Sequence, residues 1–218
     1  MLEGFYGKPW SPEERTSAIA LTASLHCGLY FYAPKDDPSH RVAWRRPLGV
    51  AEGECLGAVC GEARRRGVEV VFGLSPGLDA VWSDGREVER AVERLRQAAG
   101  FGVTRFAILF DDIDPSLCPR DAAAFHSQPA LAHAAFANAL PPSFPRFLVC
   151  PTEYCGRLIG STTPSTPSST SSSTPTTSPY LSLFGRSLLP EIAVLWTGPD
   201  VISASITTSH IKSTRSLL

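Results

Sequence analysis

The chain has 218 residues, of which 43% are hydrophobic and 19% are charged. This composition excludes a mostly disordered protein, and no apolar run approaches the roughly 20 residues that cross a bilayer. Lys and Arg total 20 against 21 for Asp and Glu, a formal net charge of -1. Proteins that bind nucleic acid through its phosphates present a basic excess, so we expect no nucleic-acid partner and no membrane partner.

Apolar and amphipathic segments alternate along the chain and predict strands and helices. Ser11 begins the first helix, because Ser-Pro-Glu-Glu is a capping box with Pro at the first helical position, and this helix ends near Cys27. A later helix contains Pro129, which breaks or bends it. The predicted helices are 11–27, 50–66, 86–99 and 121–140, and the predicted strands after the first are 29–33, 68–74, 106–110, 146–150 and 192–196.

The predicted strands are apolar on both faces and follow one another at intervals of roughly 35 to 45 residues. This pattern predicts parallel strands covered by helices, an α/β fold that is either a closed barrel or an open doubly wound sheet. No Gly-x-Gly-x-x-Gly follows a strand, which disfavours a dinucleotide-binding sheet. Residues 161–179 contain only Ser, Thr and Pro, and we expect a disordered surface loop there. A tolerated insertion is the favoured explanation, and a target of O-glycosylation or phosphorylation is the alternative.

In an α/β barrel the reactive groups lie at the carboxyl ends of the strands. Those ends are rich in aromatic residues, carboxylates and glycines, which is typical of a carbohydrate site. Tyr6 at the first strand and Val194 and Trp196 at the last are candidate sugar-binding residues. The segments at the strand ends are 3–10, 33–37, 74–77, 111–114, 151–156 and 196–199.

Asp111 and Asp112 are the most informative pair, because five apolar residues deliver two adjacent carboxylates to a strand end. Like charges side by side favour the protonated form of one of them, so one carboxylate acts as a proton donor. Adjacent residues are too close to straddle a glycosidic bond, which favours substrate-assisted hydrolysis by the sugar's acetamido group. The alternative is an acidic loop that caps a helix or binds Mg²⁺.

Two other candidates have structural alternatives. Lys35 is either a binding residue or a surface lysine paired with Asp36 or Asp37, and Tyr6 and Tyr154 are either binding residues or aromatics at the edge of the core. The five His residues have neither metal-ligand spacing nor a triad partner, and we expect them to be structural or exposed. Gly-x-Ser-x-Gly is absent, so a Ser nucleophile is disfavoured.

Six blocks, from residue 2 to about residue 201, resemble the O-GlcNAcase family, glycoside hydrolase family 84. The blocks, in order, are EGFYGKPWSPEER, YFYAPKDDPSHRVAWR, LSPGLD, FAILFDDID, CPTEYCG and VLWTGP. The resemblance implies a (β/α)8 barrel of the TIM type that removes β-linked N-acetylglucosamine from Ser and Thr of nuclear and cytoplasmic proteins. It implies neither a metal nor an organic cofactor.

The resemblance also implies roles for individual residues. Asp111 would orient and polarise the 2-acetamido group, which attacks the anomeric carbon to form an oxazoline. Asp112 would protonate the leaving oxygen and later activate water. Gly4 would hold the sugar through its backbone, and Lys35 and Tyr154 would line the same pocket.

After Pro199 nothing matches the two further strands of the family, which carry a Trp-Asp-Asn segment. We therefore expect about six of the eight strand–helix units, in a barrel domain over 1–201 with an unpatterned tail over 202–218. Two alternative functions are open. One is an inactive fragment that binds glycosylated peptides or acts as a decoy, and the other is a hexosaminidase of extracellular N-acetylhexosamine polymers. No signal peptide is visible, which favours the nucleus and cytoplasm.

Overall fold

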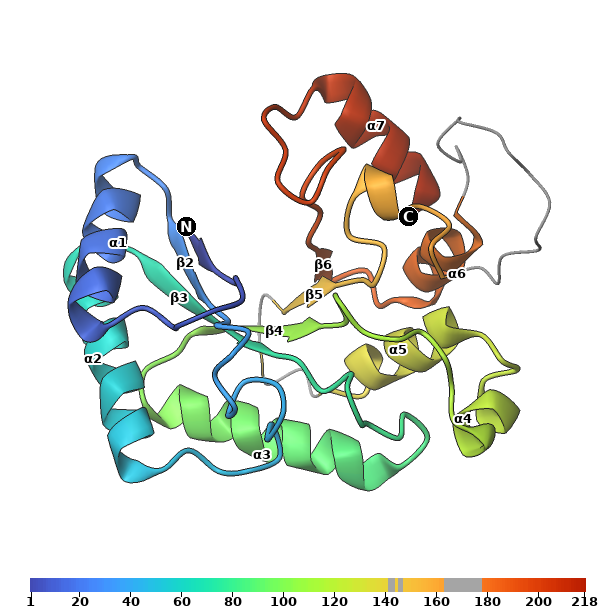
Figure 1. Cartoon of the computed structure of the whole chain (residues 1–218), viewed down its shortest axis with the longest axis horizontal. Helices are drawn as coiled ribbons and strands as arrows, with labels where there is room; N and C mark the ends of the chain where they lie inside the picture. The colour runs from blue at the N-terminus through green and yellow to red at the C-terminus, as the bar shows by residue number, and fades with distance from the viewer. Residues whose placement is uncertain (141–143, 145–146, 163–177) are drawn as a thin grey trace. The chain divides into compact units, whose positions relative to one another are not determined.

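The computed structural model describes residues 1–140, 144, 147–162 and 178–218. They form two compact units (Figure 1). The first unit comprises Met1–Ala80, Gly85–Leu109 and Leu140–Leu148, and the second comprises Val81–Asp84, Phe110–Ala139 and Val149–Leu218.

Four parallel strands form the sheet of the first unit, in the order β1-β2-β3-β4. They are β1 (Leu2–Glu3), β2 (Leu29–Tyr32), β3 (Glu69–Leu74) and β4 (Arg105–Leu109). The register aligns Glu3, Tyr32, Phe72 and Phe106 across the sheet. Because the strands are parallel, their carboxyl ends reach one edge of this sheet. The predicted parallel arrangement is confirmed, and almost every residue of β2, β3 and β4 is buried, as expected for strands with two covered faces.

The helices of the first unit are α1 (Pro12–Ser24), α2 (Val50–Arg65) and α3 (Gly85–Gly100), close to the predicted ranges. The predicted capping box begins α1, since the Ser11 hydroxyl accepts from the Glu14 N–H at 3.2 Å and the Glu14 carboxylate accepts from the Ser11 N–H at 2.7 Å. In Figure 1, α1 and α2 lie beside each other and pack against β2 and β3. Ile19 and Leu56 are buried in this core.

The second unit contains mostly helices. These are α4 (Pro119–Ala124), α5 (Pro129–Asn138), the short 3-10 helix Gly156–Leu158, α6 (Pro179–Ser187) and α7 (Thr208–Leu217), with β6 (Ala193–Val194) and the last two residues of β5 (Leu148–Cys150). The helix expected over 121–140 is thus two helices. Pro129 begins α5, and His126 and Ser127 before it have positive φ angles of 52° and 57°, which end the preceding helical segment.

The tail over 202–218, which we expect from the sequence to be unpatterned, contains a regular element. Helix α7 occupies most of it. The Thr207 hydroxyl caps this helix by accepting from the His210 N–H at 3.3 Å. Ser and Thr have low helix propensity, which hides the helix in the sequence pattern. Helix α6 was also missed, although Tyr180, Leu181 and Phe184 form a buried helical face.

Most of the expected disordered insertion, residues 163–177, lies outside the described residues, but its two ends are ordered by one carboxylate. The Thr162 hydroxyl donates to Glu153 Oε1 at 2.5 Å, and the Ser178 hydroxyl donates to Glu153 Oε2 at 2.5 Å. Ser178 also caps α6 by accepting from the Leu181 N–H at 2.8 Å. Ser178 and Pro179 therefore belong to a helix start rather than to a disordered segment.

None of the helices in the described part of the chain is both long enough and apolar enough to cross a membrane.

Candidate active site

Asp111 and Asp112 lie where the sequence predicts, just beyond β4 and the buried Phe110. Asp111 is half-buried and Asp112 is exposed. Asp112 has a φ of 54°, in the left-handed region, which Asp tolerates better than most residues. The chain therefore turns out of the strand direction at the second carboxylate.

Tyr154 contacts this second carboxylate. Its hydroxyl donates to Asp112 Oδ1 at 3.1 Å, and its side chain is 8% exposed. Burial raises the pKa of the Tyr154 phenol well above its usual value, and the negative charge of Asp112 raises it further. The phenol is therefore neutral at physiological pH and serves as a donor to the carboxylate. The structure thus brings together two of the predicted site residues, Asp112 and Tyr154, from segments 42 residues apart.

The segment after β5 is joined by backbone hydrogen bonds to the segment after β6. The Thr197 N–H donates to the Tyr154 carbonyl at 2.9 Å, and the Gly156 N–H donates to the Gly198 carbonyl at 2.9 Å. Gly198 has a φ of 100°, a conformation that favours glycine. These bonds place the WTGP block beside the block that carries Tyr154.

The candidates from the last predicted strand belong to this second unit. Val194 ends β6 and Trp196 follows two residues later, and both are half-buried. The Trp196 Nε1–H is buried and has no hydrogen-bond partner among the described residues, so it can donate to a ligand or a water.

The remaining predicted residues, Gly4, Tyr6 and Lys35, lie together in the first unit. The Ala33 N–H donates to the Glu3 carbonyl at 3.0 Å, and the Lys35 N–H donates to the Phe5 carbonyl at 3.2 Å, which joins the ends of β1 and β2. Lys35 is buried at 5% exposure, which contradicts the alternative of a surface lysine. Tyr6 is 56% exposed and therefore lies outside the core.

Two supporting contacts of this group were not predicted. The Arg41 guanidinium donates to the Tyr6 hydroxyl at 2.5 Å and lies 5.6 Å from the centre of its ring. Glu3, next to Gly4, is fully buried, pairs with Arg15 at 2.9 Å and accepts a hydrogen bond from the Tyr30 hydroxyl. A buried carboxylate needs a buried partner. The position of Glu3 within the first strand is therefore the sequence signal that could have indicated its pair with Arg15.

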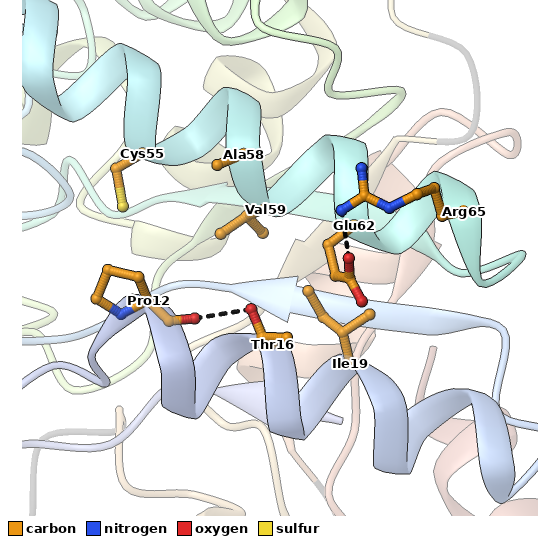
Figure 2. A pocket seen from close by; sticks show the side chains of 8 residues that line it. All are labelled: Pro12, Thr16, Ile19, Cys55, Ala58, Val59, Glu62 and Arg65. Carbon is orange, nitrogen blue, oxygen red and sulfur yellow. Dashed lines mark hydrogen bonds and ion pairs between the residues drawn. The ribbon is translucent and has the colours of Figure 1, made fainter.

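A pocket of about 260 Å³ also lies in the first unit, between α1 and α2 (Figure 2). Its lining residues are Pro12, Thr16, Ile19, Cys55, Ala58, Val59, Glu62 and Arg65. None of these is a predicted site residue, and they come from helices rather than from strand ends. We therefore place the candidate site at the strand ends, where the paired carboxylates and the buried phenol lie.

Within the described residues, His, Cys, Asp and Glu side chains form no group of three or more that could hold a metal ion. The candidate site in the second unit is instead a set of two carboxylates and a phenol, which can orient a polar substrate and transfer protons.

A family model described as beta-N-acetylglucosaminidase, NAGidase, matches residues 1–218. The chain belongs to this glycosidase family. It is 38% identical to protein O-GlcNAcase of Rattus norvegicus and 37% identical to that of Mus musculus, in each case over 222 aligned residues that cover 100% of the chain. The chain spans 23% of the length of these curated relatives.

Solved structures of this family share the fold. An O-GlcNAc hydrolase mutant of Thermobaculum terrenum matches with a TM-score of 0.86 and 30% identity, over 100% of the chain and 44% of the solved one. CpGH84B matches with a TM-score of 0.78 and 27% identity, over 100% of the chain and 36% of the solved one. These matches confirm the predicted α/β fold of the TIM-barrel type, with six strands, β1 to β6, in the described residues.

Proposed function

We propose that the chain hydrolyses β-linked N-acetylglucosamine from Ser and Thr of glycoproteins by substrate-assisted retaining catalysis. Family membership supports the class of reaction. The observation that carries the proposal for this chain is the 3.1 Å hydrogen bond from the neutral Tyr154 phenol to Asp112, beside a second carboxylate at the same strand end.

In the proposed first step, Asp111 accepts a hydrogen bond from the acetamido N–H of the sugar. This contact makes the acetamido carbonyl oxygen a better nucleophile, and the oxygen attacks the anomeric carbon. The glycosidic bond breaks as Asp112 in its acid form gives its proton to the leaving Ser or Thr oxygen. The products of this step are a protonated oxazoline, an oxazolinium ion whose N–H still donates to the Asp111 carboxylate, and the free hydroxyl group of the Ser or Thr side chain.

In the second step Asp112, now a carboxylate, takes a proton from water, and the hydroxide oxygen adds to the anomeric carbon of the oxazolinium ion. The ring opens, the acetamido group is restored, and the configuration at the anomeric carbon is retained. Tyr154 donates to Asp112, which stabilises the carboxylate form between the steps. Adjacent residues fit this division of roles, because neither carboxylate has to reach the opposite face of the sugar.

The other candidates would hold the sugar and not react. Gly4 would contact it through the backbone, Lys35 through its ammonium group and Trp196 through its indole. Tyr6, which follows β1, and Val194, which ends β6, are also proposed as substrate-binding residues.

The test is hydrolysis of aryl β-N-acetylglucosaminides with good and poor leaving groups. Asp112→Ala should lower kcat/KM about 100-fold or more with the poor leaving group and much less with the good one, because only the poor one needs an acid. Asp111→Asn should slow both substrates through the acetamido step. Equal losses for Asp112→Ala with both substrates would contradict the acid assignment.

Asp114→Ala is the matched control, because Asp114 is an exposed carboxylate in the same loop and accepts a local hydrogen bond, from the Ser116 N–H at 2.9 Å. It should leave kcat/KM within about twofold. Sugar binding by calorimetry without any turnover would instead indicate the binding-only alternative. The proposed substrates are proteins of the nucleus and cytoplasm, and turnover of an O-GlcNAc-modified protein, rather than of an N-acetylhexosamine polymer, tests that choice.

A further inference from the structure

We propose that Thr152 is a positioning residue that fixes the place of the Asp111–Asp112 pair relative to the Tyr154 hydroxyl. This inference rests on the proposed function. It concerns the buried side of the site, behind the carboxylates, and a residue that touches neither the sugar nor the reacting atoms in the proposed mechanism.

The Thr152 hydroxyl connects the ends of two strands. It donates to the Phe110 carbonyl at 2.9 Å, and Phe110 is the residue directly before Asp111. The Phe110 N–H in turn donates to the Cys150 carbonyl at 2.8 Å. Both polar groups of the Phe110 backbone are therefore held by the segment that leads, two residues beyond Thr152, to Tyr154.

Side chains from two helices of the same unit contact Thr152 and Phe110. The Thr152 N–H donates to the Tyr180 hydroxyl of α6 at 3.2 Å, and His133 Nδ1 of α5 lies 3.0 Å from the same hydroxyl. The imidazole of His133 stacks on the Phe110 ring, with centroids 4.5 Å apart and planes 8° apart. The contacts thus form a closed ring that runs through Phe110, Thr152, Tyr180 and His133.

This ring is buried and uncharged. Phe110 is fully buried, and Thr152, Tyr180 and His133 are each less than 8% exposed. Burial lowers the pKa of His133 to about 3, so the imidazole is neutral at physiological pH. If the Thr152 hydroxyl is removed, bulk water does not replace its hydrogen bond at such a buried site. The unsatisfied Phe110 carbonyl then favours a displaced position in which another donor can reach it.

The ring of contacts adjoins the residues that are proposed to act in catalysis. One side continues into Asp111 and Asp112, and the other continues into Tyr154, whose hydroxyl closes on Asp112 at 3.1 Å. Asp112 has a positive φ, so its conformation depends on the support of its neighbours. A shift of about 1 Å in a reacting group can cost about 100-fold in rate.

The experiment compares Thr152→Val, which keeps the shape and removes the hydroxyl, with Thr152→Ser, which keeps the hydroxyl. The matched control is Thr22→Val, because the Thr22 hydroxyl is also buried and donates to a carbonyl, that of Ala18, at 2.7 Å in α1. With an aryl β-N-acetylglucosaminide, Thr152→Val should lower kcat about 10- to 100-fold and change KM less than about threefold. Thr152→Ser should restore kcat to within about threefold, and Thr22→Val should leave it unchanged.

A second readout does not depend on turnover. The ¹³Cζ signal of labelled Tyr154 at neutral pH reports its hydrogen bond to Asp112, and it is assigned by its loss in Tyr154→Phe. Thr152→Val should move this signal and Thr22→Val should not. An inactive wild type in which Thr152→Val still moves the signal would overturn the proposed function and support the positioning role. An unmoved signal, or a Thr152→Ser variant as slow as Thr152→Val, would overturn the positioning role.

Discussion

Replacing Tyr154 by Phe removes one hydroxyl from the candidate site and nothing else. A hydrogen bond to a charged group contributes about 1.5 to 3 kcal/mol. The phenol is buried at 8% exposure, but Asp112 is exposed, so water can replace part of the lost contact and the lower part of this range applies. A loss of about 1.5 to 2 kcal/mol in the transition state corresponds to about 10- to 30-fold in kcat/KM.

The assay is hydrolysis of two aryl β-N-acetylglucosaminides that differ in leaving group, with Tm measured in parallel. The loss should be larger for the poor leaving group, because Tyr154 is proposed to act through the acid, Asp112. Tyr32→Phe is the control, since the Tyr32 hydroxyl also faces a carboxylate, Asp37, but at 3.5 Å and away from the paired aspartates in sequence. A Tyr154→Phe variant that keeps kcat/KM within threefold for both substrates would refute the reasoning.

Two further predictions concern stability. His40 is buried, and burial lowers its pKa to about 3 in the folded chain. In the unfolded chain the imidazole takes up a proton near pH 6.5, about its ordinary pKa. The free energy of unfolding should therefore fall as the pH drops below about 6.5, by up to about 1.4 kcal/mol per pH unit. Urea unfolding at pH 7 and pH 5 checks this, and a His40→Gln variant with an unchanged slope would contradict it. Gly53→Ala should lower Tm although Ala favours helices, because the new Cβ would lie 2.2 Å from Phe101 Cζ. Gly61→Ala in the same helix meets nothing nearer than 3.9 Å and should raise Tm, and the same sign for both variants would disprove the clash.

The sequence predicted the first unit well, because its signals are local. The capping box at Ser11 and the apolar runs of β2, β3 and β4 act within a few residues of one another. Helix α7 was missed because its Ser and Thr residues have low helix propensity and its start is marked only by a hydroxyl cap, and the single helix expected over 121–140 is divided at Pro129.

The candidate site was predictable only in part, for a similar reason. Strand-end placement led to Asp111 and Asp112 and made Tyr154 a candidate, and the family resemblance implied a role for each. The support behind them could not be found this way, since Thr152, His133 and Tyr180 are far apart in the sequence and meet only in the folded unit. The expectation that the histidines are structural or exposed is confirmed for His133, which is buried against Phe110.

The two oxygens of Glu153 hold both ends of the Ser/Thr/Pro segment, one through Thr162 and the other through Ser178. Glu153 directly precedes Tyr154, so these two hydrogen bonds also position the residue next to the phenol of the candidate site.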